Sequence, residues 1–300
     1  MQKSEVPITT GVVPGASIAA EVTPSPVGTT TPAHKDTRAD TVADAVDRRA
    51  DRRERLVIVA GQVGIGVGFL AVWQLVSGLW IDRFFISEPS LIAERIVDLA
   101  ASGELWMHLR VTVIETGIGL AIGLPAGVIL GIAVATSRIA GRWVYPYIIA
   151  LYSLPRVALA PLFIVWFGIG LFSKVMMVVT MVLFVAFYNV YQGVKSIDRD
   201  LLDMTKSYRA SRWITLRWVM LPAIGAWMLT ALRLAIGLGL IGAIIAELIG
   251  SSVGIGYYIK LSSNLFDTTG VMTGLLVITV LAMLLEQVVA FIEKRVLRYR

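Results

Sequence analysis

The chain has 300 residues, and its composition excludes a soluble domain. Apolar residues make up 56% of it and charged residues 16%, whereas soluble globular domains average roughly 45–50% and about 25%. Of the 48 charged residues, 16 lie in the first 55 positions, so the rest of the chain is too poor in charge to cover a water-exposed surface. The composition therefore predicts an integral membrane protein.

Residues 1–50 are predicted to be a disordered tail, because they are rich in Thr, Ala, Ser and Pro and cannot bury enough apolar surface to fold. They contain no apolar run long enough for a signal-peptide core. Five arginines then lie just before the first apolar run: Arg48, Arg49, Arg52, Arg53 and Arg55. We interpret this cluster as a topology anchor, with a patch for anionic lipid or regulation as the alternative.

Six later segments are long and apolar enough to cross a bilayer, which requires about 20 apolar residues in a helix. They are Leu56–Ile81, Thr116–Ser137, Trp143–Phe167, Val175–Val194, Leu221–Ile249 and Val271–Ile292. The sequence therefore predicts an all-α, polytopic membrane protein with six transmembrane helices.

Lysine and arginine residues give the orientation of these segments. The tail, the 138–142 turn, the 195–217 connection and the end after Glu293 hold 20 of them, whereas the alternate connections hold five. Cytoplasmic connections carry the excess of positive charge, so both termini are predicted to be cytoplasmic. Topology accounts for the formal net charge of +6, and we expect no nucleic-acid partner.

Residue types that carry metal or covalent chemistry are scarce in this chain. It has no cysteine, its two histidines are His34 and His108, and it contains no P-loop motif for ATP. We therefore expect no catalytic residue, no metal site and no cofactor bound by this chain.

Glycines at regular spacing indicate close helix packing rather than a nucleotide site. Gly237, Gly239 and Gly242 match GxGxxG, but they lie inside an apolar helix without the strand that a dinucleotide fingerprint requires. Four further glycines recur every four residues and would form one smooth packing face: Gly119, Gly123, Gly127 and Gly131.

The third apolar segment carries two prolines and an arginine at membrane depth. Pro155 and Pro161 break the helical hydrogen bonds, and broken backbone in a membrane is tolerated only inside protein or beside a cavity. Arg156, beside the break, either lines an aqueous path or reaches an interface from a structural kink.

Arg233 and Glu247 are the other charged residues expected at depth. They share a helix face but lie roughly 21 Å apart along the axis, too far to pair with each other. Each is therefore expected to face the protein interior or an aqueous path, with an interfacial position as the alternative for Glu247. We take Pro155, Arg156, Pro161, Arg233 and Glu247 as candidate residues of the translocation path.

The longest cytoplasmic connection, residues 198–220, has the pattern of a basic amphipathic helix. Its stripe of mainly apolar residues consists of Leu201, Leu202, Thr205, Tyr208, Ala210, Trp213 and Leu216, and Lys206, Arg209 and Arg212 lie opposite. Such a helix either lies on the membrane surface or inserts into a groove of a partner protein.

This connection resembles the EAA motif of binding-protein-dependent ABC importer permeases. Asp203, Met204 and Thr205 stand at EAA, Arg209 stands at the glycine of the motif, and Leu221-Pro222 stand at its Leu-Pro pair. Residues 155–170 resemble the PxxAxxPLxxxWFGxG stretch of nitrate/sulfonate/taurine-type permeases. The resemblance extends from Ser87 to the end of the chain.

The resemblance implies a permease domain over residues 51–300 with a cytoplasmic coupling helix, in the bacterial inner membrane. It implies two ATPase subunits that bind ATP and Mg, a second permease copy expected to be identical, and an extracytoplasmic solute-binding protein. The implied ATPase-coupling residues are Asp203, Met204, Thr205, Tyr208, Arg209, Ala210, Leu221 and Pro222.

The function implied is the inward movement of a small polar or anionic organic solute, like a sulfonate, nitrate or taurine, by ATP-driven alternating access. The same machinery for a pyrimidine precursor, a flavin or an aromatic acid is the alternative, because Arg156 and Glu115 depart from the sulfonate-type pattern. An ion-coupled secondary transporter is the rival of a different class, but the chain shows no repeated half.

Overall fold

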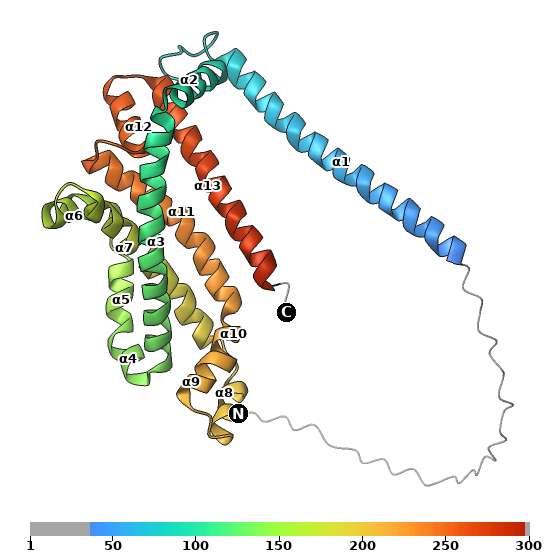
Figure 1. Cartoon of the computed structure of the whole chain (residues 1–300), viewed down its shortest axis with the longest axis vertical. Helices are drawn as coiled ribbons and strands as arrows, with labels where there is room; N and C mark the ends of the chain where they lie inside the picture. The colour runs from blue at the N-terminus through green and yellow to red at the C-terminus, as the bar shows by residue number, and fades with distance from the viewer. Residues whose placement is uncertain (1–36, 298–300) are drawn as a thin grey trace, which may run out of the picture. The chain divides into compact units, whose positions relative to one another are not determined.

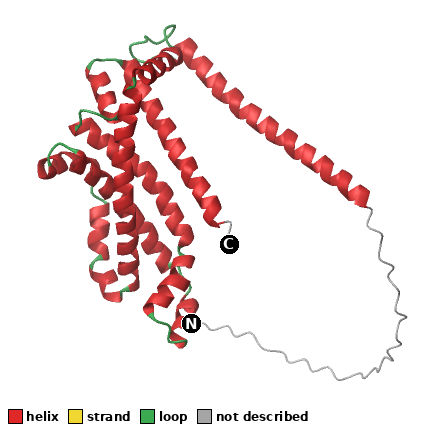
Figure 2. Ribbon diagram, in the orientation of Figure 1, coloured by secondary structure: helices red, strands yellow, loops and turns green. Residues whose placement is uncertain are grey.

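A computed structural model describes residues 37–297, in which the regular structure is helical apart from one isolated bridge between Ser77 and Ile81 (Figure 2). Residues 1–36, most of the predicted tail, lie outside the described residues. The chain divides into two units, residues 1–63 and 64–300.

The helices follow one another along the chain with short connections (Figure 1). They are α1 (Thr37–Val76), α2 (Pro89–Ser102), α3 (Glu104–Thr136), α4 (Arg138–Trp143), α5 (Tyr145–Tyr152), α6 (Ala160–Phe167), α7 (Leu171–Lys195), α8 (Arg199–Ser207), α9 (Arg212–Thr215), α10 (Leu221–Ala223), α11 (Gly225–Gly250), α12 (Ile255–Asn264) and α13 (Thr268–Leu297). A 3-10 turn, Arg156–Leu159, precedes α6, and a π-helical turn, Leu216–Met220, precedes α10.

The first unit contains the beginning of α1. This helix starts at Thr37, so residues 37–50 are helical although the sequence places them in the tail. The stretch contains Ala and Arg, both strong helix formers, and has neither Gly nor Pro. The helix therefore begins before the position at which the predicted tail ends.

The core of the second unit is formed by α3, α7 and α11, which pack against one another. Val178 and Val182 of α7 are fully buried beside Ala235 and Ala243 of α11. The four regularly spaced glycines of α3 face α7, and a Cβ atom added at Gly131 would lie 3.0 Å from the carbonyl oxygen of Phe187. The predicted packing face is therefore confirmed, because a larger side chain there would separate the two helices.

The GxGxxG glycines of α11 also serve helix packing. A Cβ atom at Gly242 would lie 3.2 Å from Cα of Val178 in α7, and one at Gly239 would contact Val182. Gly237 faces open space. A packing role is confirmed for two of the three glycines, which lie inside a helix.

The third predicted span is a bent pair of helical segments rather than one straight helix. Residues 145–152 and 156–167 meet at an angle of 86°. Pro155 lies at the corner, where it cannot donate a hydrogen bond, and Pro161 lies at the start of α6. By length and composition five helices can cross a membrane, or six if the bent pair is one span. The predicted all-α membrane fold is confirmed.

Apart from the corner between α5 and α6, the connections of the second unit lie mainly toward two opposite ends of the bundle (Figure 1). One end, here called the α12 end, carries α2, α12 and residues 251–254; the other, here called the α8 end, carries α4, α8 and α9. The predicted cytoplasmic connections, 138–142 and 195–217, therefore lie at the same end.

Candidate functional site

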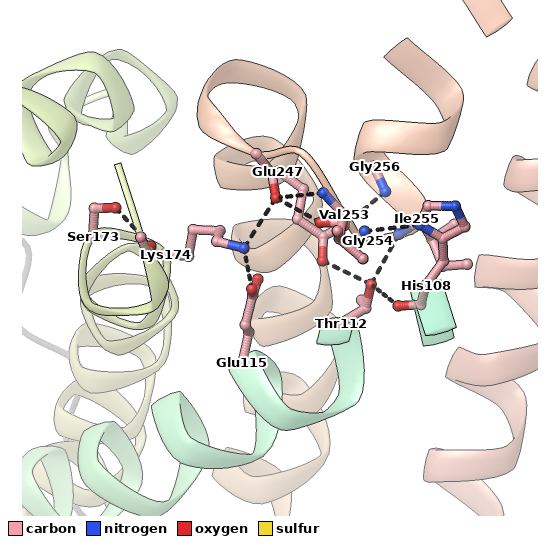
Figure 3. A network of polar contacts seen from close by, with 12 residues as sticks. His108, Thr112, Glu115, Ser173, Lys174, Glu247, Val253, Gly254, Ile255 and Gly256 are labelled. Atoms are coloured by element: carbon pink, nitrogen blue, oxygen red, sulfur yellow. Dashed lines mark hydrogen bonds and ion pairs between the residues drawn. The ribbon is translucent and has the colours of Figure 1, made fainter. Parts of the chain in front are cut away.

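A network of buried polar side chains lies at the α12 end, where α3, α7 and α11 meet the loop before α12 (Figure 3). Glu247 of α11 is 0% exposed, and both of its carboxylate oxygens are bound. Oε1 accepts a hydrogen bond of 2.7 Å from the hydroxyl of Thr112, and Oε2 accepts one of 2.7 Å from the backbone N–H of Gly256. Glu247 thus faces the protein interior, the first of the positions predicted for it.

The same network binds three successive backbone N–H groups at the start of α12. Nδ1 of His108 accepts from Gly254 at 3.0 Å, and Oγ1 of Thr112 accepts from Ile255 at 3.0 Å. The third N–H, that of Gly256, is the one bound by Glu247. The first N–H groups of a helix have no partner within it, and a carboxylate there also interacts favourably with the helix dipole. Side chains of α3 and α11 therefore fix the position of α12.

Only glycine fits at position 254 in this arrangement. Its φ of +125° is rarely adopted by residues with a side chain, and a Cβ atom there would overlap the carboxylate of Glu247. The two glycines of the Gly-Ile-Gly-Tyr sequence at 254–257 are thus explained by close approach of the backbone to Glu247.

The second half of the network is a buried ion pair between Lys174 of α7 and Glu115 of α3. Lys174 Nζ also donates to Oγ of Ser251 at 3.0 Å, and that hydroxyl lies 2.5 Å from the carbonyl oxygen of Val253. The pair connects two core helices to the loop that leads into α12. Among the described residues, no group of three His, Cys, Asp or Glu side chains is placed to hold a metal ion.

Arg233, the other charged path candidate of α11, forms an ion pair with Glu293 of α13. Arg233 and Glu247 therefore have separate partners and are not brought together, as their spacing predicted. The pair links α11 to α13, and the side chain of Arg233 is still about half exposed.

Arg156 lies at the corner between α5 and α6 and folds back onto the break. Its Nη2 donates to the carbonyl oxygen of Tyr152 at 3.0 Å, and its Nη1 donates to that of Met181 at 3.4 Å. The Tyr152 carbonyl belongs to the last turn of α5, where helical partners are missing. No carboxylate of the described residues forms an ion pair with Arg156.

The predicted amphipathic helix of the 198–220 connection is divided in the structure. α8 ends at Ser207, and Arg209 has a φ of +50°, in the left-handed region. The N–H of Ala210 donates to the carbonyl oxygen of Thr205 at 2.9 Å, and α9 then begins after Ser211. A residue in this conformation terminates a helix and is usually glycine. The break therefore falls where the resembling motif has glycine.

The two faces of α8 differ in exposure. Leu202 packs against the apolar cluster of α7, α10 and their neighbours, and Leu221 of α10 joins the same cluster. Met204 is 56% exposed and Tyr208 is 81% exposed. Asp203 accepts a hydrogen bond of 2.6 Å from Lys206, and this cation lowers the pKa of Asp203 below its usual value. Pro222 lies in the first turn of α10.

Sequence reasoning missed the ion pair of Lys174 and the helix-capping roles of His108 and Thr112. Lys174 and Glu115 are 59 positions apart and lie on different helices, so no spacing relates them. The sequence did contain one signal for this pair. Lys174 and Glu115 are single opposite charges next to apolar segments, where unpaired charges are costly, so each needs a partner.

Comparison with known proteins gives a family and a fold. Residues 123–298 match the family of binding-protein-dependent transport system inner membrane components. The chain is 33% identical to a putative aliphatic sulfonates transport permease protein of Escherichia coli K12, over 78% of this chain and 89% of that protein. It is 29% identical to a formylaminopyrimidine transport permease protein of Halalkalibacterium halodurans, over 77% and 92%. A chain of the MetNI methionine ABC transporter in an inward-facing conformation superposes with a TM-score of 0.52 at 20% identity, over 66% of this chain and 95% of that one.

Proposed function

This chain belongs to the family of binding-protein-dependent transport system inner membrane components, and we propose that it moves a small polar or anionic organic solute inward by ATP-driven alternating access. It is the permease subunit of an ABC importer, a multi-pass membrane protein that works with a separate ATPase and a solute-binding protein. The observation that carries the proposal is the match to this family over residues 123–298 together with the exposed α8 turn.

The relatives support two substrate classes. One is named for aliphatic sulfonates, which are small anions, and another for formylaminopyrimidine, which is a heterocyclic precursor. An arginine without a carboxylate partner at membrane depth, Arg156, favours a solute that carries negative charge. Pyrimidine-type, flavin and aromatic-acid solutes are the second candidate.

In the assembly we propose, two copies of this chain associate with two ATPase subunits, and each ATPase binds ATP and Mg²⁺. In this assembly the ATPase subunits hydrolyse ATP, and the permease moves the solute. Both termini and the α8 end face the cytoplasm, a proposal supported by the excess of Lys and Arg in the connections at that end.

The α8 turn is the proposed contact with the ATPase. Met204 and Tyr208 are exposed apolar and aromatic groups next to a chain reversal, and Leu202 on the opposite face is packed into the bundle. A movement of the ATPase against this turn would therefore be transmitted to α7 and α10. Asp203, Thr205, Arg209 and Ala210 complete the turn, and Leu221-Pro222 connect it to α11.

Charge reversal at the turn tests this proposal. Arg209→Glu is expected to reduce co-purification of the ATPase by about tenfold and to abolish uptake. It replaces a positive charge at the contact with a negative one, so electrostatic complementarity with the ATPase is lost. Arg209→Gly is expected to keep both, since glycine suits the left-handed backbone there. Arg138→Glu, an exposed arginine of α4, is the matched control. Normal ATPase binding and uptake by Arg209→Glu would contradict the docking role.

A further inference from the structure

Two aromatic rings contact Arg156 at the corner between α5 and α6, and a third ring stacks on one of them. The centre of its guanidinium lies 4.7 Å from the ring centroid of Tyr152 and 5.7 Å from that of Phe184 in α7. The rings of Tyr152 and Tyr188 are stacked, with centroids 5.8 Å apart and planes 13° from parallel. A cation and three aromatic faces from two helices are thus gathered in one place.

The hydrogen-bonding capacity of Arg156 is only partly used. A guanidinium has five N–H donors, and the oxygen acceptors it contacts are two backbone carbonyls. Its Nε is buried and has no partner among the described residues. Lys174 and Arg233, the corresponding cations of α7 and α11, each pair with a glutamate. Arg156 therefore keeps a positive charge that carbonyls and rings do not neutralise.

The surroundings of Arg156 are unsuited to lipid. A charged group and broken backbone facing hydrocarbon are both costly, so this corner is expected to face protein or a polar cavity. The ring of Tyr188 reaches the surface, with 37% of the residue exposed, and the Ser153 side chain at the break is exposed as well. Accessible aromatic and polar groups therefore adjoin the buried part of the guanidinium.

We propose that Tyr152, Arg156, Phe184 and Tyr188 form a binding site for a planar anion, an aromatic carboxylate or sulfonate. A guanidinium binds such a group through paired, charge-assisted hydrogen bonds, and tyrosine and phenylalanine rings stack on its planar part. The site rests on the proposed import function and adds to it the chemical class of the solute.

The test uses the full-length chain, co-expressed with its ATPase and reconstituted in nanodiscs of zwitterionic lipid. Benzenesulfonate, methanesulfonate and benzamide are titrated, and binding is followed by saturation-transfer NMR. Benzenesulfonate combines the charge and the ring, whereas each of the others has only one of them. It is expected to bind saturably and at least about tenfold more tightly than either, because hydrogen bonds to charged groups and stacking both contribute.

Variants separate the two parts of the site. Arg156→Gln is expected to weaken benzenesulfonate binding by about tenfold to hundredfold and to leave benzamide unchanged. Tyr188→Leu is expected to reduce the preference for benzenesulfonate over methanesulfonate. Arg156→Lys keeps the charge but loses the paired hydrogen bonds, so it is expected to weaken benzenesulfonate binding less than Arg156→Gln does, and it serves if the glutamine variant does not fold. Arg138→Gln and Tyr147→Leu, an exposed arginine and an exposed tyrosine outside the cluster, are matched controls expected to bind like the wild type.

Equal binding of benzenesulfonate and methanesulfonate, unchanged binding in the Arg156 variants, or no saturable binding would each overturn the site. Loss of benzenesulfonate binding when anionic lipid replaces zwitterionic lipid would also overturn it, since the anion at Arg156 would then be a lipid headgroup. None of these results touches the import function, which fails separately if the ATPase does not associate with the chain.

Discussion

The two ends of the second unit use polar residues in opposite ways. At the α12 end the charged and hydrogen-bonding groups are buried and bound to one another, from Lys174 and Glu115 to Glu247 and the first N–H groups of α12. At the α8 end Met204, Tyr208 and their charged neighbours are exposed. A buried, mutually bound network fixes the position of a loop, whereas an exposed turn on a packed helix is available to a partner.

This difference predicts that substitutions at the α12 end lower stability, whereas substitutions at the α8 end weaken assembly with the ATPase. Changes in the α12 network leave buried groups without partners, and such groups carry their full desolvation cost. Changes of the exposed side chains Met204 and Tyr208 leave no buried group without a partner, so they are expected to alter association with the ATPase instead.

The largest effect is expected from Lys174→Met. The substitution leaves the carboxylate of Glu115 buried and unpaired, which costs about 3–5 kcal/mol of stability. Thermal unfolding in detergent, followed by the fraction of protein that stays monodisperse, measures the loss. The double variant Lys174→Met/Glu115→Leu removes both charges and is expected to regain most of the stability. A double variant no more stable than the single one would show that the pair is not the cause.

Thr112→Val is expected to have an intermediate effect. Valine has nearly the same shape but cannot accept from the N–H of Ile255 or donate to Glu247, so about 1–3 kcal/mol should be lost. Hydrogen exchange of the first amides of α12 should speed up, because these amides lose their anchor. Thr136→Val, whose hydroxyl bonds to its own helix, is the control. Unchanged exchange in α12 would mean that Thr112 does not hold this helix.

The smallest effect on stability is expected from Arg209→Gly. Glycine relieves the left-handed backbone, and the gain should be at most about 1 kcal/mol. Lys206→Gly, in the last turn of α8, should instead lower stability because glycine is a poor helix former and the hydrogen bond to Asp203 is lost. Urea unfolding of the two variants compares them directly. A loss of stability in both would place Arg209 in an ordinary helical conformation.

The sequence predicts the membrane fold well because long apolar runs in lipid have few alternatives to a helix. The predicted segment Val175–Val194 lies within α7. The regular glycines of α3 predict a smooth face for helix packing, but they do not identify α7 as the helix that packs there. The contacts of Lys174 and His108 depend on how separate helices are rotated about their axes. A single sequence contains no direct record of that rotation.

The break at Arg209 illustrates the same limit at the α8 end. Its stripe of mainly apolar residues predicts one continuous helix, since arginine is a good helix former. The left-handed φ of Arg209 divides that helix, and only the resemblance to a motif with glycine at this position indicated the bend. Local propensity therefore failed at the residue proposed for contact with the ATPase.

Accessibility of single cysteines tests the contrast between the two ends most directly, because the natural chain has no cysteine. Met204→Cys at the α8 end and Ser263→Cys at the α12 end are labelled with an impermeant maleimide in oriented vesicles, with and without the ATPase. We predict that Met204→Cys reacts only from the cytoplasmic side and is protected when the ATPase is bound, whereas Ser263→Cys reacts only from outside and is insensitive to the ATPase. Labelling of Met204→Cys from outside, or at the same rate with and without the ATPase, would contradict the account.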